Sequence, residues 1–578
     1  MKLYKISLFA FGVALLTASC TDMDEQFYEG GSLTPEQRNA AYEAVPSRVD
    51  ASFSGMYNLM ANGGSGRVFP NSPRHDDFGF VMAAISLSLE GADAFGGDNG
   101  YNWFSTASEY SDRDPNYANP YIRYTVPYRQ AGVATELINS LGEMLEANPE
   151  DTVNLYKLAQ AHAIRAFDYM ALAPYFAGNY QNHQNDLCIP LLGSGADFDF
   201  SNNPRATVKQ VYEQIIKDLN FAVDNLKGFD RGVDYSSAEN YDDTSINKMY
   251  IDRNVAFGLR ARANLYMGNW AAAAADADSA LAATEFAPAY EAASMADVSV
   301  PAFCQLKEKN WMWGILITKD QGSDYGYRTS DAWVSAFTGD GYGPATGNVP
   351  VINKLLYDKI NATDVRKGWW LDATKHSDNW ANITWVDTKT GATAKGDDIA
   401  DYVDEGGAKI EFEPYTNIKF GMKDGIASAT NCNDWPLMRA EEMILIKAEG
   451  LAKSGNEGEA KTVLENFVKN YRDPGYSVAL GGRSLADEIW FQRRVELWME
   501  GFSVVDARRL EKPIVRFIPG RESNVPAAFK FNIAPDNAWL NMRFPQTEVD
   551  ANHGIVDNEG GTQPQSEEGA DLRDGVTD

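Results

Sequence analysis

The residues best suited to ligand chemistry lie in one segment that is rich in both glycine and aromatic side chains. Residues 90–104 read EGADAFGGDNGYNWF. Glycine and large rings without a helical or strand period indicate flat side chains on a surface loop. Such rings stack on the apolar C–H faces of sugar rings, each contact contributing about 1 kcal/mol, while carboxylates and amides bind hydroxyls. We predict a binding site at Asp93, Tyr101, Asn102 and Trp103, with simple loop packing as the alternative.

A second group of aromatic residues lies within residues 285–430, which contain many Gly and Asp residues and show little sustained period. We expect Tyr325, Tyr327, Trp333 and Tyr342 to lie opposite the 90–104 loop across the site. The apolar run at 311–317 predicts a buried strand or the start of a helix. This region is therefore predicted to be the variable, loop-rich part of the molecule.

The sequence contains no recognisable catalytic or metal-binding motif. The histidines form no ligand pattern: His75, His162, His183, His376 and His553. Asp112, Asp114 and Asn116 alternate as calcium ligands do, but Tyr117 stands where an EF-hand needs glycine. Carboxylates are abundant, yet a sequence cannot measure the separation that glycoside hydrolysis requires. We predict no catalytic residue, no metal and no cofactor, and glycoside hydrolase remains a remote alternative.

Helical pairs must position these loops. Leu437, Glu441, Ile444, Ala448 and Leu451 form one helical stripe, and a second helix follows the break at residues 455–456. A third helix is predicted between a cap at residue 484 and a stop at residue 501. Residues 255–281, with small residues and a turn glycine followed by tryptophan, resemble a tetratricopeptide repeat, and 127–176 and 207–226 are weaker versions.

Charged residues are dense around the third helix of this region. They include Arg493, Arg494, Glu496, Glu500, Asp506, Arg508 and Arg509. Their proximity to the apolar residues 497–499 predicts a partly buried ion-pair network that fixes how the helices dock.

The amino terminus reads as a secretion signal. A short basic start and an apolar run of residues 6–16 precede small residues and Cys20. A cysteine at this place is typical of a bacterial lipoprotein cleavage site, and a lipidated Cys20 would hold the chain at a membrane. The remaining cysteines, Cys188, Cys304 and Cys432, have no zinc-like spacing. We expect buried thiols, and one disulfide stays open.

The formal net charge of −30 argues against nucleic acid as a partner, because phosphate binding requires concentrated positive charge.

The strings PLMRAEEMILIKAE at 436–449 and RRVELWMEG at 493–501 resemble the SusD/RagB family of outer-membrane lipoproteins. Shorter matches, RAFDY at 165–169, RATV at 205–208 and FPQTE at 544–548, extend the resemblance over residues 120–552. Ser503 departs from it, since the family often has arginine there.

The resemblance implies a mainly α fold in which tetratricopeptide-like helical repeats form a single large SusD-like domain with few short strands. The expected organisation is a signal peptide at 1–19, a lipidated tether at 20–45, the domain at 46–552 and an acidic, partly mobile tail at 553–578. Helical repeats are expected over 127–283 and 435–510, and the variable part over 285–430.

The implied function is capture of glycans at the cell surface and delivery to a SusC-like TonB-dependent outer-membrane transporter. Peptide or another nutrient is the alternative ligand on the same scaffold, and the chain is not expected to be an enzyme.

Trp103→Ala is predicted to weaken glycan retention in native affinity gels while leaving thermal unfolding nearly unchanged, because a loop ring contributes to contact and little to the core. A large fall in melting temperature would instead identify Trp103 as a core residue.

Overall fold

The structure is a computed structural model of residues 1–578. It describes residues 35–45, 47–60, 68–69, 74–100, 102–193, 198–232, 244–322, 333–339, 347–386, 393–396, 412–426, 428–430, 432–561 and 563–578. The chain divides into two compact units, Met1–Asp50 and Ala51–Asp578. The second unit contains all the predicted ligand-binding residues that the structure describes.

The described residues are mostly helical, with a few short strands. The α-helices are α2 Pro35–Ala44, α3 Ser47–Asn58, α4 Gly79–Glu90, α5 Ser105–Ser108, α6 Ala118–Ala147, α7 Thr152–Phe176, α8 Tyr180–His183, α9 Val208–Asn225, α10 Arg253–Met267, α11 Trp270–Leu281, α12 Met295–Val298, α13 Lys319–Gly322, α15 Lys354–Tyr357, α16 Ala440–Lys453, α17 Glu457–Tyr471, α18 Leu485–Glu496, α19 Ser503–Arg509 and α20 Gln546–Ala551. The 3₁₀ helices are η1 Ser111–Arg113, η2 Phe200–Asn202, η3 Thr244–Met249, η5 Val365–Trp369, η6 Asp378–Asn382, η8 Ala527–Phe529 and η9 Ala538–Leu540.

Each strand of the described residues belongs to an antiparallel pair. The strands are β1 Ala94–Phe95, β2 Leu187–Pro190, β3 Arg205–Thr207, β4 Trp311–Ile315, β5 Val351–Ile352, β6 Thr384–Val386, β7 Thr393–Lys395 and β8 Trp435–Arg439. They pair as β1–β5, β2–β3, β4–β8 and β6–β7. β4 is buried along its whole length, which confirms a strand in the apolar run after residue 310.

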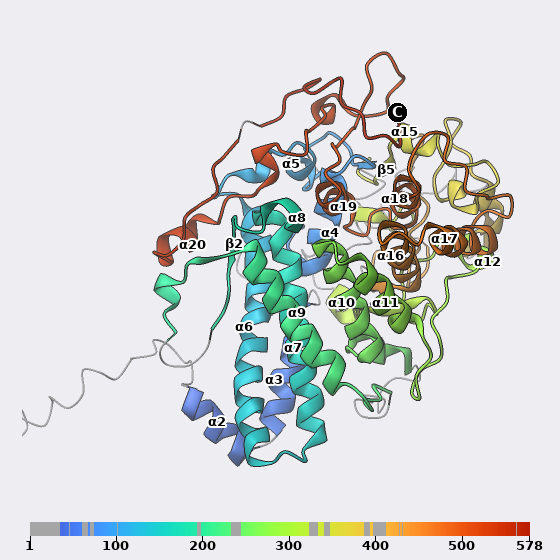
Figure 1. The fold of residues 1–578 in the computed structure, drawn as a ribbon. Coiled ribbons are helices and arrows are strands. Elements are labelled where there is room, and N and C mark those ends of the chain that lie inside the picture. Colours follow the sequence, from blue (N-terminus) through green and yellow to red (C-terminus); the bar gives the residue numbers. More distant parts are fainter. Residues whose placement is uncertain are drawn as a thin grey trace, which may run out of the picture. The chain divides into compact units, whose positions relative to one another are not determined.

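The long helices pack against one another in pairs, as expected for helical repeats. α6 packs on α7, α7 on α9, α10 on α11, and α11 on α16 (Figure 1). Local sequence sets the ends: the Asp151 side chain accepts a hydrogen bond from the backbone N–H of Asn154 at the start of α7. Gly268 ends α10 with a φ of 78°, a left-handed conformation that glycine adopts without a steric penalty. The mainly α, repeat-based fold is thus confirmed.

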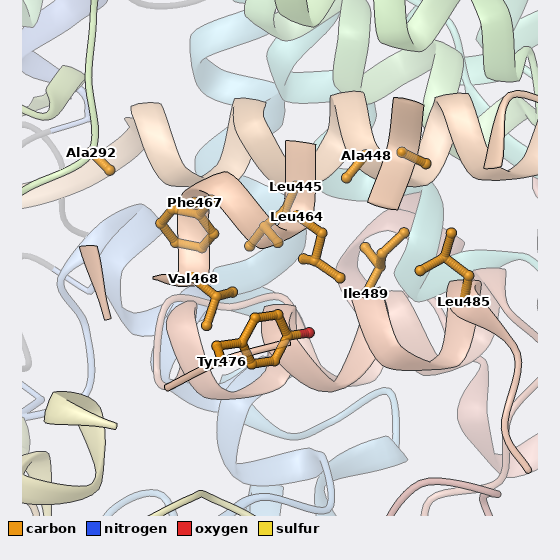
Figure 2. Close-up of a cluster of buried hydrophobic side chains, with 10 residues drawn as sticks. Ala292, Leu445, Ala448, Leu464, Phe467, Val468, Tyr476, Leu485 and Ile489 are labelled. Atoms are coloured by element: carbon orange, nitrogen blue, oxygen red, sulfur yellow. The ribbon is translucent and has the colours of Figure 1, made fainter. Parts of the chain in front are cut away.

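α16, α17 and α18 share an apolar core. Figure 2 shows side chains from these helices pointing toward one another: Leu445, Ala448, Leu464, Phe467, Val468, Leu485 and Ile489. All are buried, and fully burying a leucine or isoleucine side chain contributes about 1.5–3 kcal/mol. This core gives α18 a fixed position from which its charged residues reach the loops.

Three helix boundaries differ from the sequence prediction. Leu437 lies in β8, not in a helix, because the residues before Ala440 pair with β4. α18 ends at Glu496, and Gly501, with a φ of 90°, ends the turn that follows it. The first repeat helix begins at Ala118 and accommodates Pro127 in its interior, although residue 127 was predicted as its start.

The last residues of the tail contact α18. Asp574 and Thr577 are buried, and the carboxylate of Asp574 accepts a hydrogen bond from Arg494 Nη1 at 2.7 Å. These last residues therefore pack in the same unit as the helices, and the partial mobility of the tail stays a prediction.

The predicted ion-pair network is present and buried. Glu496 receives Arg366, Arg439 and Arg472 at 2.8–3.3 Å. Glu500 binds Arg439 at 2.8 Å and Lys419 at 2.7 Å. These groups come from α18 and its following turn, β8, the end of α17, η5 and residue 419, so the network joins the variable part to the repeats. Because each charge has an opposite partner, its burial is tolerated.

The three described cysteines, Cys188, Cys304 and Cys432, are buried, as expected from the sequence. Within the described ranges, none of the helices has the length and apolar character needed to cross a membrane.

The substitution Glu449→Gln tests how much the buried ion pair of Glu449 and Arg509 contributes to stability, and how this contribution depends on pH. Burial alone would raise the pKa of Glu449, but the charge of Arg509, whose two amino groups lie at 2.6 and 2.8 Å, holds it at about 2. A depressed pKa stabilises the fold above about 4.5, and this contribution is lost as pH falls toward 2. In urea unfolding, the variant should be less stable at pH 7 by about 3 kcal/mol, with the difference shrinking below pH 4.5.

Glu459→Gln, at an exposed position on α17, is the matched control and should leave stability unchanged. A Glu449→Gln difference that is the same at every pH would contradict this account.

Candidate functional site

The glycine-rich loop follows α4 and is fixed at its base by a strand pair. β1 pairs with β5, Ala94 opposite Ile352 and Phe95 opposite Val351. Asn353 strengthens the junction: its backbone N–H donates to the Asp93 carbonyl at 2.9 Å, and its side-chain amide donates to the Ala92 carbonyl at 2.8 Å. The loop therefore leaves the core from a defined position.

Asp93 is held by α18. It is 3% exposed, and both its carboxylate oxygens accept hydrogen bonds from Arg494, at distances down to 2.6 Å. Trp498 Nε1 donates to the Asp93 carbonyl at 2.9 Å. Arg494 also binds Asp574; although burial alone would raise the pKa of that carboxyl, the guanidinium holds it below its usual range. The structure thus places the Asp93 carboxylate in an ion pair at the foot of the loop.

Arg516 binds the backbone at the start of the same loop. Its guanidinium donates to the backbone carbonyls of Leu89, Glu90 and Gly91 at 3.0–3.1 Å. Carbonyls at the end of a helix lack partners within the helix, so this contact satisfies the end of α4. Burial lowers the pKa of Arg516 to about 10, which leaves it charged at neutral pH.

Asn102 and the glycines shape the loop itself. The Asn102 side chain donates to the Gly97 carbonyl at 2.7 Å and accepts from the backbone N–H of Phe104 at 3.0 Å. A Cβ atom on Gly97 would lie 2.6 Å from the Gly347 carbonyl oxygen, so only glycine permits this approach. Asn102 is buried, and its hydrogen bonds are made within the loop.

Trp103 and Trp333 lie in one aromatic group. Trp103 is partly buried, with the Arg74 guanidinium 5.1 Å from its ring centroid and the His75 ring edge-on at 5.0 Å. Trp333 is 2% exposed; its Nε1 donates to the His75 carbonyl at 3.0 Å, and its ring packs on Phe104 at 5.2 Å. The expected proximity of Trp333 to the loop is therefore present, with Trp333 beneath the surface and Trp103 partly open to solvent.

A cavity of about 330 Å³ borders the loop at its glycine end. Gly96 and Gly97 form part of its wall, and the segment 412–416 forms another part. The lining includes Phe412, Glu413, Tyr415, Thr416, Asn524 and Pro526. The volume lies within the range of about 300–1,000 Å³ typical of small-molecule sites, and the aromatic and polar mixture suits a polyhydroxylated ligand.

Tyr415 adopts an unusual backbone conformation beside this cavity. Its φ is +68°, in the left-handed region, which costs a non-glycine residue roughly 1–2 kcal/mol. The cost is offset by surrounding contacts: the Tyr415 carbonyl accepts from the backbone N–H of Ile352 at 3.1 Å, and its ring packs on Tyr357. Such strain is common at ligand sites.

The segment 412–416 and Asn524 were not predicted from sequence. They have no periodic spacing and no motif, and only the folded chain brings them to the loop. Among predicted residues, Tyr101, Tyr325, Tyr327, Tyr342 and Cys20 lie outside the described residues.

Within the described ranges, no cluster of His, Cys, Asp or Glu side chains is arranged to hold a metal ion. Asp112, one of the alternating acidic residues noted in the sequence, instead pairs with Arg113 at 3.2 Å. The ligand role of the predicted residues stays a prediction.

Comparison with known proteins gives two family matches. Residues 87–227 match a family described as "Starch-binding associating with outer membrane", and residues 317–563 match the SusD family. Together these matches span more than half of the chain and contain the loop, α18 and segment 412–416. A comparison of the chain with curated proteins found no match.

Solved structures share the fold over nearly the whole chain. A SusD-like carbohydrate binding protein from Bacteroides vulgatus is 20% identical, covering 89% of this chain and 98% of its own, with a TM-score of 0.66. A SusD superfamily protein from Bacteroides thetaiotaomicron is 18% identical, covering 91% and 100%, with a TM-score of 0.63. A laminarin binding SusD-like protein is 16% identical, covering 89% and 99%, with a TM-score of 0.57.

At these identities the structural likeness shows the fold, and the two family matches agree with it. The chain belongs to the SusD/RagB family.

Proposed function

We propose that this protein is a cell-surface lipoprotein that captures glycans and passes them to a SusC-like TonB-dependent outer-membrane transporter. The observation that carries the proposal is the cavity between Gly96–Gly97 and segment 412–416, next to the loop that the sequence predicts as a binding site. The description of the matched family as starch-binding, and the laminarin-binding and carbohydrate-binding names of structural neighbours, support a glycan ligand.

The architecture of the loop supports binding as the activity. Asp93, Arg494 and Arg516 hold the loop base through buried hydrogen bonds, so the site is formed before a ligand arrives. A preformed site loses little conformational entropy on binding, which favours affinity. Glycan capture requires a rigid platform with aromatic and polar contacts, and no step of bond cleavage is part of the proposal.

Delivery to a transporter rests on the amino terminus. A lipidated Cys20 would hold the chain at the outer membrane and raise its effective concentration beside a membrane partner. A broad and individually weak contact with the transporter is then sufficient. In this proposal Tyr101, Trp103 and the aromatic residues of the variable part contact the glycan together with the cavity wall.

Native affinity electrophoresis of residues 21–578 through gels that contain single polysaccharides tests the proposal. We expect one polysaccharide class to retard the protein while the polymer stays uncut. Glu413→Gln, an exposed carboxylate in the cavity wall, should weaken binding roughly tenfold because a charge-assisted hydrogen bond to a hydroxyl is lost.

Glu457→Gln, exposed at the start of α17, is the matched control and should migrate like the parent. Normal migration in every gel, with no oligosaccharide binding by calorimetry, would exclude glycan capture and favour a peptide or another nutrient. Release of reducing ends from the polymer would instead identify a hydrolase.

A further inference from the structure

A second groove lies in a different part of the fold. It is lined by residues of α6 and α20, by Phe200 of η2, and by Pro190, Leu192 and Asn203. The groove has a volume of about 430 Å³, larger than the cavity at the glycine-rich loop. None of the residues predicted from the sequence to bind ligand lines it.

Aromatic rings dominate this groove. Tyr121, Tyr124 and Tyr128 recur at steps of three and four along α6, which places them on one face of the helix. The Tyr124 and Tyr128 ring centroids lie 4.5 Å apart, and Tyr124 is backed by Phe176 and Phe544. Tyr124 is buried, whereas Tyr121 and Tyr128 are partly exposed, so these rings form a tyrosine platform with a packed base.

Phe200 faces the same groove from η2. Its side chain is 68% exposed, the largest exposure among the large hydrophobic residues described. Exposing a phenyl ring to water is unfavourable unless a ligand or partner covers it, and rings of this kind are enriched at binding surfaces. Phe200 is therefore the best candidate for direct contact.

The walls are fixed to one another by hydrogen bonds. The Asn203 backbone N–H donates to Asn552 Oδ1 at 2.9 Å, and Asn552 Nδ2 donates to the Asn203 carbonyl at 2.8 Å. The Tyr128 hydroxyl donates to the Pro190 carbonyl at 2.6 Å. These contacts join α6 to β2 and the end of η2 to the end of α20, so the groove lies between elements that are held in place.

The polar groups indicate the chemistry of the occupant. The groove is lined by one guanidinium, Arg129, and one carboxylate, Glu548. Because these charges balance, the groove favours a ligand without net charge. Thr125, Asn203 and Thr547 add hydroxyl and amide groups. A ligand with apolar faces and many hydroxyls satisfies both the rings and these groups, whereas a charged peptide or a fatty chain satisfies only one of the two sets.

We propose that the groove of α6, η2 and α20 is a second glycan-contact site, which binds a neutral polysaccharide segment on the tyrosine platform and Phe200. This inference rests on the proposed function, since the ligand class is the same, but it concerns separate residues. A second contact on one chain would raise the retention of long polymers relative to short fragments through avidity.

Affinity gels containing the neutral polysaccharide that retards the parent protein test the site. Phe200→Ala should weaken retardation roughly fivefold, because one aromatic contact is lost. Glu413→Gln should leave residual retardation, and the double variant Glu413→Gln with Phe200→Ala should remove it. Phe286→Ala is the matched control, an aromatic that is 42% exposed and lies outside the groove.

Three outcomes separate the two proposals. Loss with Phe200→Ala but not with Phe286→Ala supports the second site. Parent-like retardation of Phe200→Ala, with all binding lost in Glu413→Gln, overturns the second site and leaves glycan capture intact. Absence of retardation of the parent protein by any polysaccharide overturns both, and equal melting temperatures of the variants exclude unfolding as the cause.

Discussion

The ion pair between Asp93 and Arg494 is the interaction on which the candidate site depends. Arg494 lies on α18, and Asp93 begins the glycine-rich loop, so one buried contact joins the helical repeats to the loop. Removing two charges from water is costly, and the pair is stabilising only because the geometry is close and further hydrogen bonds are made. Asp574, on the other side of Arg494, supplies a second carboxylate. Loss of Arg494 would remove the guanidinium that both carboxylates share, whereas loss of Asp93 would leave Arg494 paired with Asp574 alone.

α18 serves two networks at once. Arg494 points to the loop, and Glu496, two residues later, receives three arginines from the variable part, β8 and the end of α17. The dense charge of this helix therefore fixes the loop and the variable part on the same support. Rigidity of this kind suits binding, because groups held in position before a ligand arrives lose less entropy when it binds. Segment 412–416, with its strained Tyr415, is held beside the loop through Ile352 of β5.

Periodic features of the sequence predicted the fold well. The repeat predicted over 127–176 ends at Phe176, the last residue of α7, and the predicted ion-pair network contains Glu496 and Glu500 as expected. The predicted start of α16 was wrong because Leu437 fits the helical stripe. In the structure Leu437 lies in β8, which pairs with β4, a strand more than a hundred residues away in the sequence. Local pattern carries no information on such a partner. The burial of Asp574 could not be predicted for the same reason, since its partner Arg494 is distant in the sequence.

The candidate site was only partly predictable. The composition of residues 90–104 predicted the glycine-rich loop, and Trp103 and Trp333 were predicted to lie on opposite sides of one site. The structure places both near His75. Asp93 was predicted to contact ligand because a carboxylate in such a loop suits hydroxyls, but the structure shows Arg494 as its partner. Phe412, Tyr415 and Phe200 have no motif or spacing, and their significance follows from the cavities they line.

Hydrogen exchange measured by mass spectrometry, with and without the retarding glycan, tests the central claim most directly. The account predicts slower exchange in peptides that cover residues 96–104 and 412–416 when the glycan is bound. Unchanged exchange in both segments at saturating glycan would contradict it, because ligand in the cavity must cover these backbones.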